Sequence, residues 1–159
     1  MGIKSKHRFA LPFEAAFEKG ALLVGEVEPV FTYDSRRRAY TTEQERDELT
    51  GQLKWKARLM DLDLDVKGKQ SGLDLIFLAD VRPVPVTQEI TPNVRPIQLE
   101  GVTVEVRASV QGDFATMTFA YWATGIKGDT SGSKLPPMDV PASRPVRSDK
   151  SAADAKAVA

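Results

Sequence analysis

The residues of this chain that could take part in chemistry are mainly basic, and one group of them alternates with apolar side chains. It lies in residues 54–60, which read KWKARLM. In an extended chain successive side chains point to opposite faces. Lys54, Lys56 and Arg58 would therefore form a cationic row, while Trp55 and the apolar residues that follow it face inward. A sheet with one buried face and one basic face can bind a polyanion.

A second basic group lies in the polar segment that precedes this strand, where three arginines follow one another and a tyrosine comes shortly after. Stacking of bases on aromatic rings and contacts from arginine to phosphates would be the binding chemistry. The alternative is a solvated strand face whose lysines prevent edge pairing, and nearby acidic residues partly cancel the arginines. The predicted nucleic-acid-binding set is Arg36, Arg37, Arg38, Tyr40, Lys54, Lys56, Arg58 and Arg82.

Catalytic and metal chemistry find little support in this composition. The chain has no cysteine and one histidine, His7, so the usual triads and zinc sites cannot be built. Asp61, Asp63 and Asp65 alternate as in a calcium loop, but that loop needs a glycine and a glutamate further on, where Val66 and Gly72 stand. We expect a protein that is not an enzyme and uses no metal or cofactor, with carboxylate chemistry as the alternative left open.

Net charge and hydropathy restrict the partners. The formal net charge of the 159 residues is zero, so any nucleic-acid binding must come from a local patch. No apolar run approaches the roughly 20 residues of a membrane-spanning helix. The absence of cysteine fits a cytoplasmic protein. We expect a cytoplasmic chain without a membrane partner, and a homo-oligomer is possible.

The elements that must position these residues are mostly strands. Pro12 to Lys19 predicts one or two helical turns, with Phe13 and Phe17 packing on the sheet. Thr42 and Glu45 match a capping box, which allows a short helix over residues 43–49. The proline-rich residues 82–101 should be extended and irregular. Strands are expected at 21–33, 53–62, 73–81, 102–110 and 114–124, with a tight turn at 111–113.

Two strands carry specific orientation predictions. In residues 102–110 the alternation predicts that the four valines and the alanine face inward: Val102, Val104, Val106, Ala108 and Val110. Tyr121 and Trp122 are adjacent, so a strand turns them to opposite faces and one of them should lie on the outer face.

Five strands with long first and third connections predict an all-β domain. The expected architecture is a small antiparallel five-stranded barrel or curled sheet, OB-like, although residues 82–101 cannot supply the helix that many OB barrels contain. The predicted organisation is a basic mobile arm (1–11), the all-β domain (12–126) and a disordered C-terminal tail (127–159).

Four segments together resemble a known protein family. They are residues 20–30 (GALLVGEVEPV), 50–56 (TGQLKWK), 94–101 (VRPIQLEG) and 123–125 (ATG). Their order and spacing are similar to those of the activator proteins of actinobacterial plasmids and integrative elements, the family named for plasmid replication, integration and excision. The resemblance implies a role in turning on replication and excision of a mobile element, and it carries over no catalytic residue.

Two hypotheses follow. The first is a non-enzymatic accessory protein of a mobile genetic element that binds DNA, with single strands favoured because no recognition helix is evident. The second is a protein-interaction module that regulates replication without touching nucleic acid. It would dock on a replication or recombination protein through the Pro83 to Pro96 segment and an outward aromatic ring.

Overall fold

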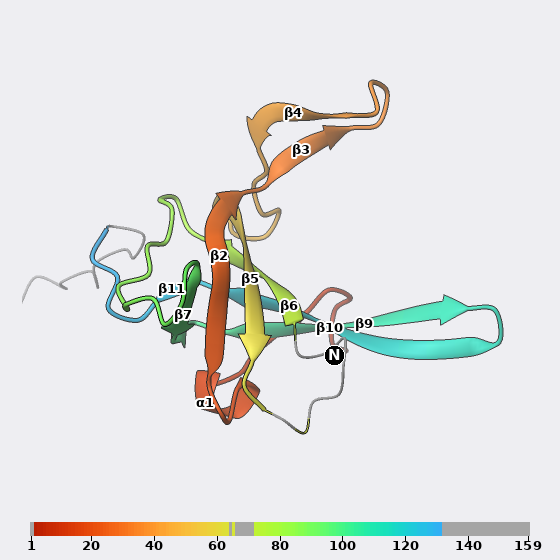
Figure 1. Cartoon of the computed structure of the whole chain (residues 1–159). Coiled ribbons are helices and arrows are strands. Elements are labelled where there is room, and N and C mark those ends of the chain that lie inside the picture. Colours follow the sequence, from red (N-terminus) through yellow and green to blue (C-terminus); the bar gives the residue numbers. More distant parts are fainter. Residues whose placement is uncertain (1, 64, 66–71, 132–159) are drawn as a thin grey trace, which may run out of the picture.

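The computed structural model describes residues 2–63, 65 and 72–131, and this part of the chain is nearly all-β, as predicted (Figure 1). The main element is an open, mixed sheet of seven strands. In spatial order these are β1 (Arg8–Ala10), β9 (Thr103–Gln111), β10 (Phe114–Ala123), β6 (Gly72–Leu78), β5 (Lys54–Asp61), β2 (Ala21–Pro29) and β7 (Val94–Ile97).

Two smaller sheets and one short helix complete the described part. β3 (Phe31–Asp34) pairs with β4 (Ala39–Gln44), and β8 (Leu99–Glu100) pairs with β11 (Gly125–Ile126). The helix α1 spans Phe13–Ala16. No helix of the described residues is both long enough and apolar enough to cross a membrane.

The sheet differs from the predicted five-stranded antiparallel one in strand number and direction. Residues 82–101 contain β7 and β8, and β7 pairs with β2 at the sheet edge, so this segment is not wholly irregular. β10 lies between β9 and β6 in the sheet and runs parallel to β6, with Tyr121 opposite Leu75. The other pairings in this sheet are antiparallel.

The core lies against one face of the sheet. Leu23, Leu59, Leu75 and Phe77 are fully buried there, and Phe17 packs over them after α1. Burial of large apolar side chains of this kind stabilises the fold by roughly 1.5–3 kcal/mol each. The prediction that residues 13 and 17 anchor on the sheet is confirmed.

The orientation predicted for the second strand is also confirmed. Ala57 and Leu59 are buried, whereas Lys56 and Arg58 are exposed. Trp55 is half-buried, packs against the core, and its Nε1 donates a hydrogen bond to the carbonyl oxygen of Ala79 at 2.9 Å. The indole is therefore held by both packing and a hydrogen bond.

The secondary structure predicted from local sequence patterns was wrong around the polar segment after β2. The expected strand 21–33 breaks at Val30 into β2 and β3, and the expected helix over 43–49 is absent. Residues 39–44 form β4 instead, because they pair with β3. A turn follows at residues 48–50, where the Asp47 carboxylate accepts hydrogen bonds from the N–H and hydroxyl of Thr50.

Both predicted flexible ends are partly docked. Arg8–Ala10 of the predicted mobile arm forms β1 on β9, so the arm interpretation does not hold there. At the other end, Asp129 is buried and its carboxylate accepts a hydrogen bond from the N–H of Val84 at 3.0 Å. The tail predicted from residue 127 therefore begins with packed residues, and its remainder, 132–159, lies outside the described residues.

The tight turn predicted at 111–113 is present and comprises residues 112 and 113, since Gln111 still belongs to β9. The inward prediction for residues 102–110 holds only at Val102 and Val104. Val106 and Val110 are 45% and 71% exposed, and Ala108 is exposed as well. The reason is that β9 and β10 run on past the rest of the sheet as a two-stranded ribbon (Figure 1).

Candidate nucleic-acid interface

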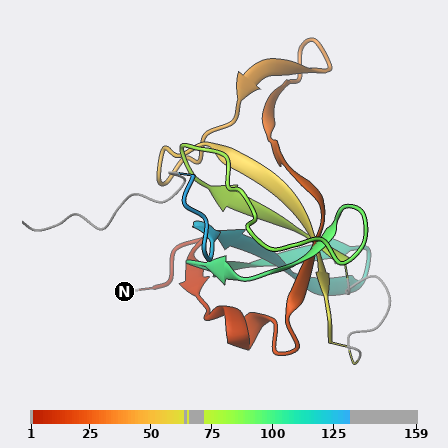
Figure 2. The same ribbon diagram turned by 60° about the vertical axis from the view of Figure 1, so that its left-hand side comes forward.

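The candidate interface is the hairpin formed by β3 and β4, residues 31–44, here called the basic hairpin. It stands away from the main sheet, where β2 ends and β5 begins, in both views (Figures 1 and 2). Its base is held by main-chain hydrogen bonds, from the N–H of Val30 to the carbonyl of Lys54 and from the N–H of Glu45 to the carbonyl of Val30. The hairpin thus continues the β2–β5 pair into solvent.

The turn of this hairpin places the three predicted arginines at its tip. The Asp34 carboxylate accepts hydrogen bonds from the main-chain N–H groups of Arg36 (2.9 Å) and Arg37 (3.3 Å), which is the usual way an aspartate closes a turn. Arg38 adopts a left-handed conformation with φ of 53°. All three side chains are exposed.

Aromatic rings line the hairpin below its tip. Tyr33 lies opposite Tyr40, with ring centroids 5.2 Å apart and planes at 69°, an edge-to-face pair. The two residues are 55% and 75% exposed. Thr32 and Thr41 contact each other through their hydroxyl groups. Exposed rings on a rigid cross-strand pair are surfaces on which bases can stack.

A groove of about 580 Å³ separates the basic hairpin from the sheet. Phe31 and Tyr40 line it from the hairpin, and Lys56 and Glu28 line it from the sheet. The structure therefore brings together two predicted site residues, Tyr40 and Lys56, that are 16 positions apart. Phe31, 40% exposed, was not among the predicted site residues and adds a third ring.

The charges at the tip remain available to a ligand. Arg37 lies 3.6 Å from the Asp34 carboxylate, yet its side chain is 85% exposed, so the pair is solvated and weak. Arg36 and Arg38 form no ion pair with any described residue. A guanidinium keeps its charge at any physiological pH and can contact a phosphate through two N–H groups.

The remaining predicted residues point elsewhere. Arg58 pairs with Asp74 at 3.3 Å and Arg82 with Glu26 at 3.2 Å, both on the surface. Lys54 is largely covered, with 16% of its side chain exposed and its Nζ 2.7 Å from the Glu45 carboxylate. The cationic row is thus divided, and only Lys56 faces the groove.

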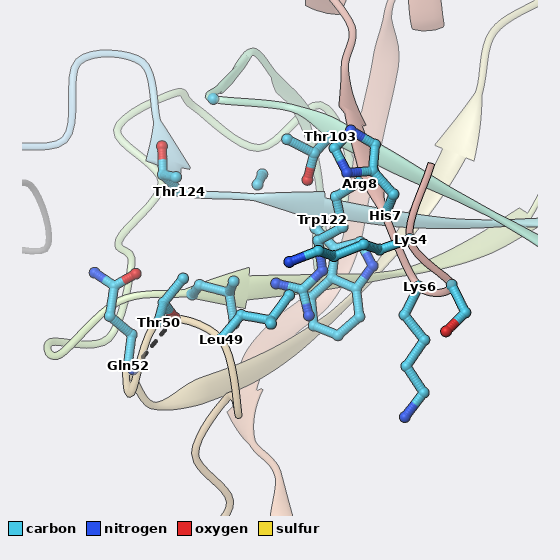
Figure 3. Close-up of a pocket in the computed structure, with 14 residues that line it drawn as sticks. Lys4, Lys6, His7, Arg8, Leu49, Thr50, Gln52, Thr103, Trp122 and Thr124 are labelled. Atoms are coloured by element: carbon cyan, nitrogen blue, oxygen red, sulfur yellow. Dashed lines mark hydrogen bonds between the residues drawn. The ribbon is translucent and has the colours of Figure 1, made fainter. Parts of the chain in front are cut away.

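Lys54 belongs instead to a cluster around Trp122 that sequence reasoning missed. Arg8 forms two hydrogen bonds to Asp47, at 2.6 and 3.0 Å, and its Cζ lies 3.7 Å from the centroid of the Trp122 ring. The Lys54 Nζ lies 5.7 Å from the same centroid. Trp122 is the outward member of the predicted pair, but it is buried, and the Arg8 guanidinium lies over its ring (Figure 3).

The Arg8–Asp47 ion pair is strong because it is shielded from water. Only 3% of the Asp47 side chain is exposed. The hydrogen bonds from Arg8 lower the pKa of the Asp47 carboxyl to about 2, against the opposing effect of its burial. The pair joins the β4–β5 connection to β1, two segments 39 residues apart in sequence.

A pocket of about 420 Å³ adjoins this cluster (Figure 3). Lys4, Lys6 and His7 line it from the N-terminal segment, together with Trp122. The Nε1 of Trp122 and the Nε of Arg8 have no hydrogen-bond partner in the part of the chain that the structure describes. The same part contains no group of three or more histidine or acidic side chains suited to a metal.

Comparisons with protein-family models, with curated proteins and with solved structures found no match to this chain. The resemblance to the plasmid activator family therefore stays an expectation.

Proposed function

We propose that this chain is a non-enzymatic, DNA-associated accessory protein that binds single-stranded DNA through the basic hairpin. The observation that supports this most is the grouping of three exposed arginines with the exposed Tyr33–Tyr40 pair on one projecting element. Arginines at the tip would hold phosphates, and the tyrosine rings would stack bases.

A single strand suits this geometry better than a duplex read through its major groove. The described residues contain one helix, α1, and it has four residues, too short to serve as a recognition helix. Stacking also requires bases that are free of their partners, which a single strand provides.

The biological setting comes from the resemblance. It implies that the protein activates replication and excision of a plasmid or integrative element in the cytoplasm, and such processes expose single strands. The OB-like architecture also stays a prediction, and the proposal does not depend on it, because its binding surface is the projecting hairpin.

The test is fluorescence anisotropy with a labelled single-stranded oligonucleotide, titrated at several salt concentrations. We expect binding whose affinity falls steeply with salt, since phosphate contacts release counterions. Arg36→Gln with Arg38→Asn should weaken binding at least tenfold and flatten the salt dependence by about two phosphate contacts. Asparagine suits position 38 because it tolerates a positive φ.

The matched control removes two exposed charges elsewhere. Lys19→Gln with Lys127→Gln changes the net charge equally but lies away from the basic hairpin. Equal weakening by both double variants would show that binding follows overall charge and not this hairpin. No binding at tens of micromolar protein in low salt would reject the proposal.

The competing candidate is docking on a replication protein through residues 83–96. Its support is the exposure of Val84, Val86 and Ile90, at 45%, 56% and 68%. A pull-down from nuclease-treated lysate separates the two: partners that survive the nuclease favour protein docking, and loss of every partner favours DNA.

A further inference from the structure

The ribbon of β9 and β10 beyond the sheet, residues 106–119, is here called the apolar arm. β1 pairs with β9 only as far as Glu105, and β6 pairs with β10 only from Tyr121. Between these points the two strands have only each other as partners among the described residues. Figure 1 shows the arm extending well past the body of the protein.

The two faces of this arm differ sharply in chemistry. On one face the cross-strand pairs are Val106 with Phe119, Ala108 with Met117, and Val110 with Ala115, and all six side chains are apolar. The other face pairs Arg107 with Thr118, Ser109 with Thr116, and Gln111 with Phe114.

The apolar face is a continuation of the core surface. The next pair inward on the same face is Val104 with Tyr121, where Val104 is buried and Tyr121 packs against Phe17, their ring centroids 5.9 Å apart. Beyond this pair the covering elements end, and Met117 and Phe119 are 67% and 54% exposed. A contiguous apolar surface on a projecting ribbon is typical of an interaction site.

We propose that a second copy of this chain covers the apolar arm, the two arms packing face to face about a two-fold axis. In such an isologous contact each face must be complementary to itself. This face satisfies that condition because it carries no charge and no polar side chain, so apolar groups meet apolar groups. The formal net charge of zero adds no repulsion between copies.

The size of the exposed apolar surface determines how strong the contact between two copies can be. Four large side chains of the face are largely exposed: Val106, Val110, Met117 and Phe119. Together they offer apolar surface on the order of 300 Å² per copy. A groove of about 570 Å³ lies at the base of the arm, where Leu73 and Tyr121 continue the apolar surface. Glu18, Asp61 and Asp63 also line this groove, so only its apolar side can join the contact. A stable interface needs roughly 800 Å² per partner, so the arm with the apolar side of the groove suits a weak, concentration-dependent dimer.

Nucleic acid does not fit this surface, because the face offers no cation to phosphates. The proposal is thus independent of DNA binding by the basic hairpin, and either can fail without the other.

Sedimentation velocity of the full chain, from about 5 to 200 µM, tests the dimer. We expect the wild type to move from monomer to dimer within this range. Met117→Lys places a charge on the apolar face and should raise the dimer dissociation constant at least tenfold, and Val110→Lys should do the same. Thr116→Lys, the neighbour on the opposite face, should leave it within twofold.

All three substituted positions, Val110, Thr116 and Met117, are exposed on the arm, so circular dichroism should report unchanged folding. A wild type that stays monomeric across the range would overturn the proposal and assign the face to another occupant, such as a membrane surface or a different protein. Equal effects of Met117→Lys and Thr116→Lys on the dimer dissociation constant would also overturn the proposal, because dimerisation would then not depend on the apolar face.

Discussion

Two hairpins leave the same sheet and present opposite chemistry to solvent. The basic hairpin (31–44) exposes arginines and tyrosines, whereas the apolar arm (106–119) exposes valines, a methionine and phenylalanines. Neither set is explained by the needs of the core, because neither element packs against it. The molecule thus exposes two separate surfaces of opposite chemistry, and we propose the first for a polyanion and the second for an apolar protein face.

The two hairpins are also anchored differently. The apolar arm is rooted by its own strands, since β9 and β10 continue into the ladder of the main sheet. The basic hairpin leaves the sheet where β2 ends and β5 begins, and the connection that follows it is held by the Arg8–Asp47 ion pair. Loss of that ion pair should therefore loosen the basic hairpin before the arm.

The largest expected effect is that of Asp47→Asn. It leaves Arg8 without its carboxylate in a site where 14% of its side chain is exposed, and breaking a buried pair costs about 3–5 kcal/mol. Chemical denaturation should show this loss, whereas the control Asp74→Asn, in the exposed pair with Arg58, should change stability by less than about 1 kcal/mol. Equal small effects would show that the buried pair does not anchor the structure.

The next largest effect concerns binding. Tyr33→Ala with Tyr40→Ala should weaken single-stranded DNA binding by about 3 kcal/mol, since each stacked base contributes about 1–3 kcal/mol. Phe114→Ala on the apolar arm, with its ring 78% exposed, is the control and should leave the affinity unchanged. If Phe114→Ala weakens DNA binding as much as the tyrosine changes do, the assignment of DNA binding to the basic hairpin alone is wrong.

Acid should weaken the anchor of the basic hairpin. The folded-state pKa of Asp47 is about 2, below the usual aspartate value near 3.9, so its stabilising effect is complete above about pH 4. As the pH falls from 4 toward 2, about 2 kcal/mol should be lost through protonation of this carboxyl. Denaturation of wild type and Asp47→Asn at pH 6 and pH 2.5 checks this: the gap between them should narrow in acid.

The contrast between the hairpins also shows which structural features could be predicted from the sequence alone. Alternation in residues 54–61 correctly placed Ala57 and Leu59 inside and Lys56 outside, because the pleat imposes a period of two. The same rule predicted which side chains of residues 102–110 share a face. It could not say that the covering layer ends after Val104, since that depends on other segments.

Distant contacts were equally beyond local patterns. Arg8 and Asp47 stood in segments interpreted as a mobile arm and a possible short helix of a polar segment, and nothing near either one indicates a partner 39 residues away. The capping box over residues 42–45 failed for a related reason. Pairing of β4 with β3 outweighed a local preference that contributes only about 1 kcal/mol.

The smallest expected effect tests how the cationic row is divided. Lys56 lines the groove beside Tyr40, whereas Arg58, two residues further along the same strand face, pairs with Asp74. Lys56→Gln should reduce the salt dependence of DNA binding by about one phosphate contact and the affinity several-fold. Arg58→Gln removes an equal charge and should change neither quantity. Equal effects of the two would mean that the whole strand face binds DNA, as the alternation of basic residues first predicted, and that the basic hairpin is only one part of a broader surface.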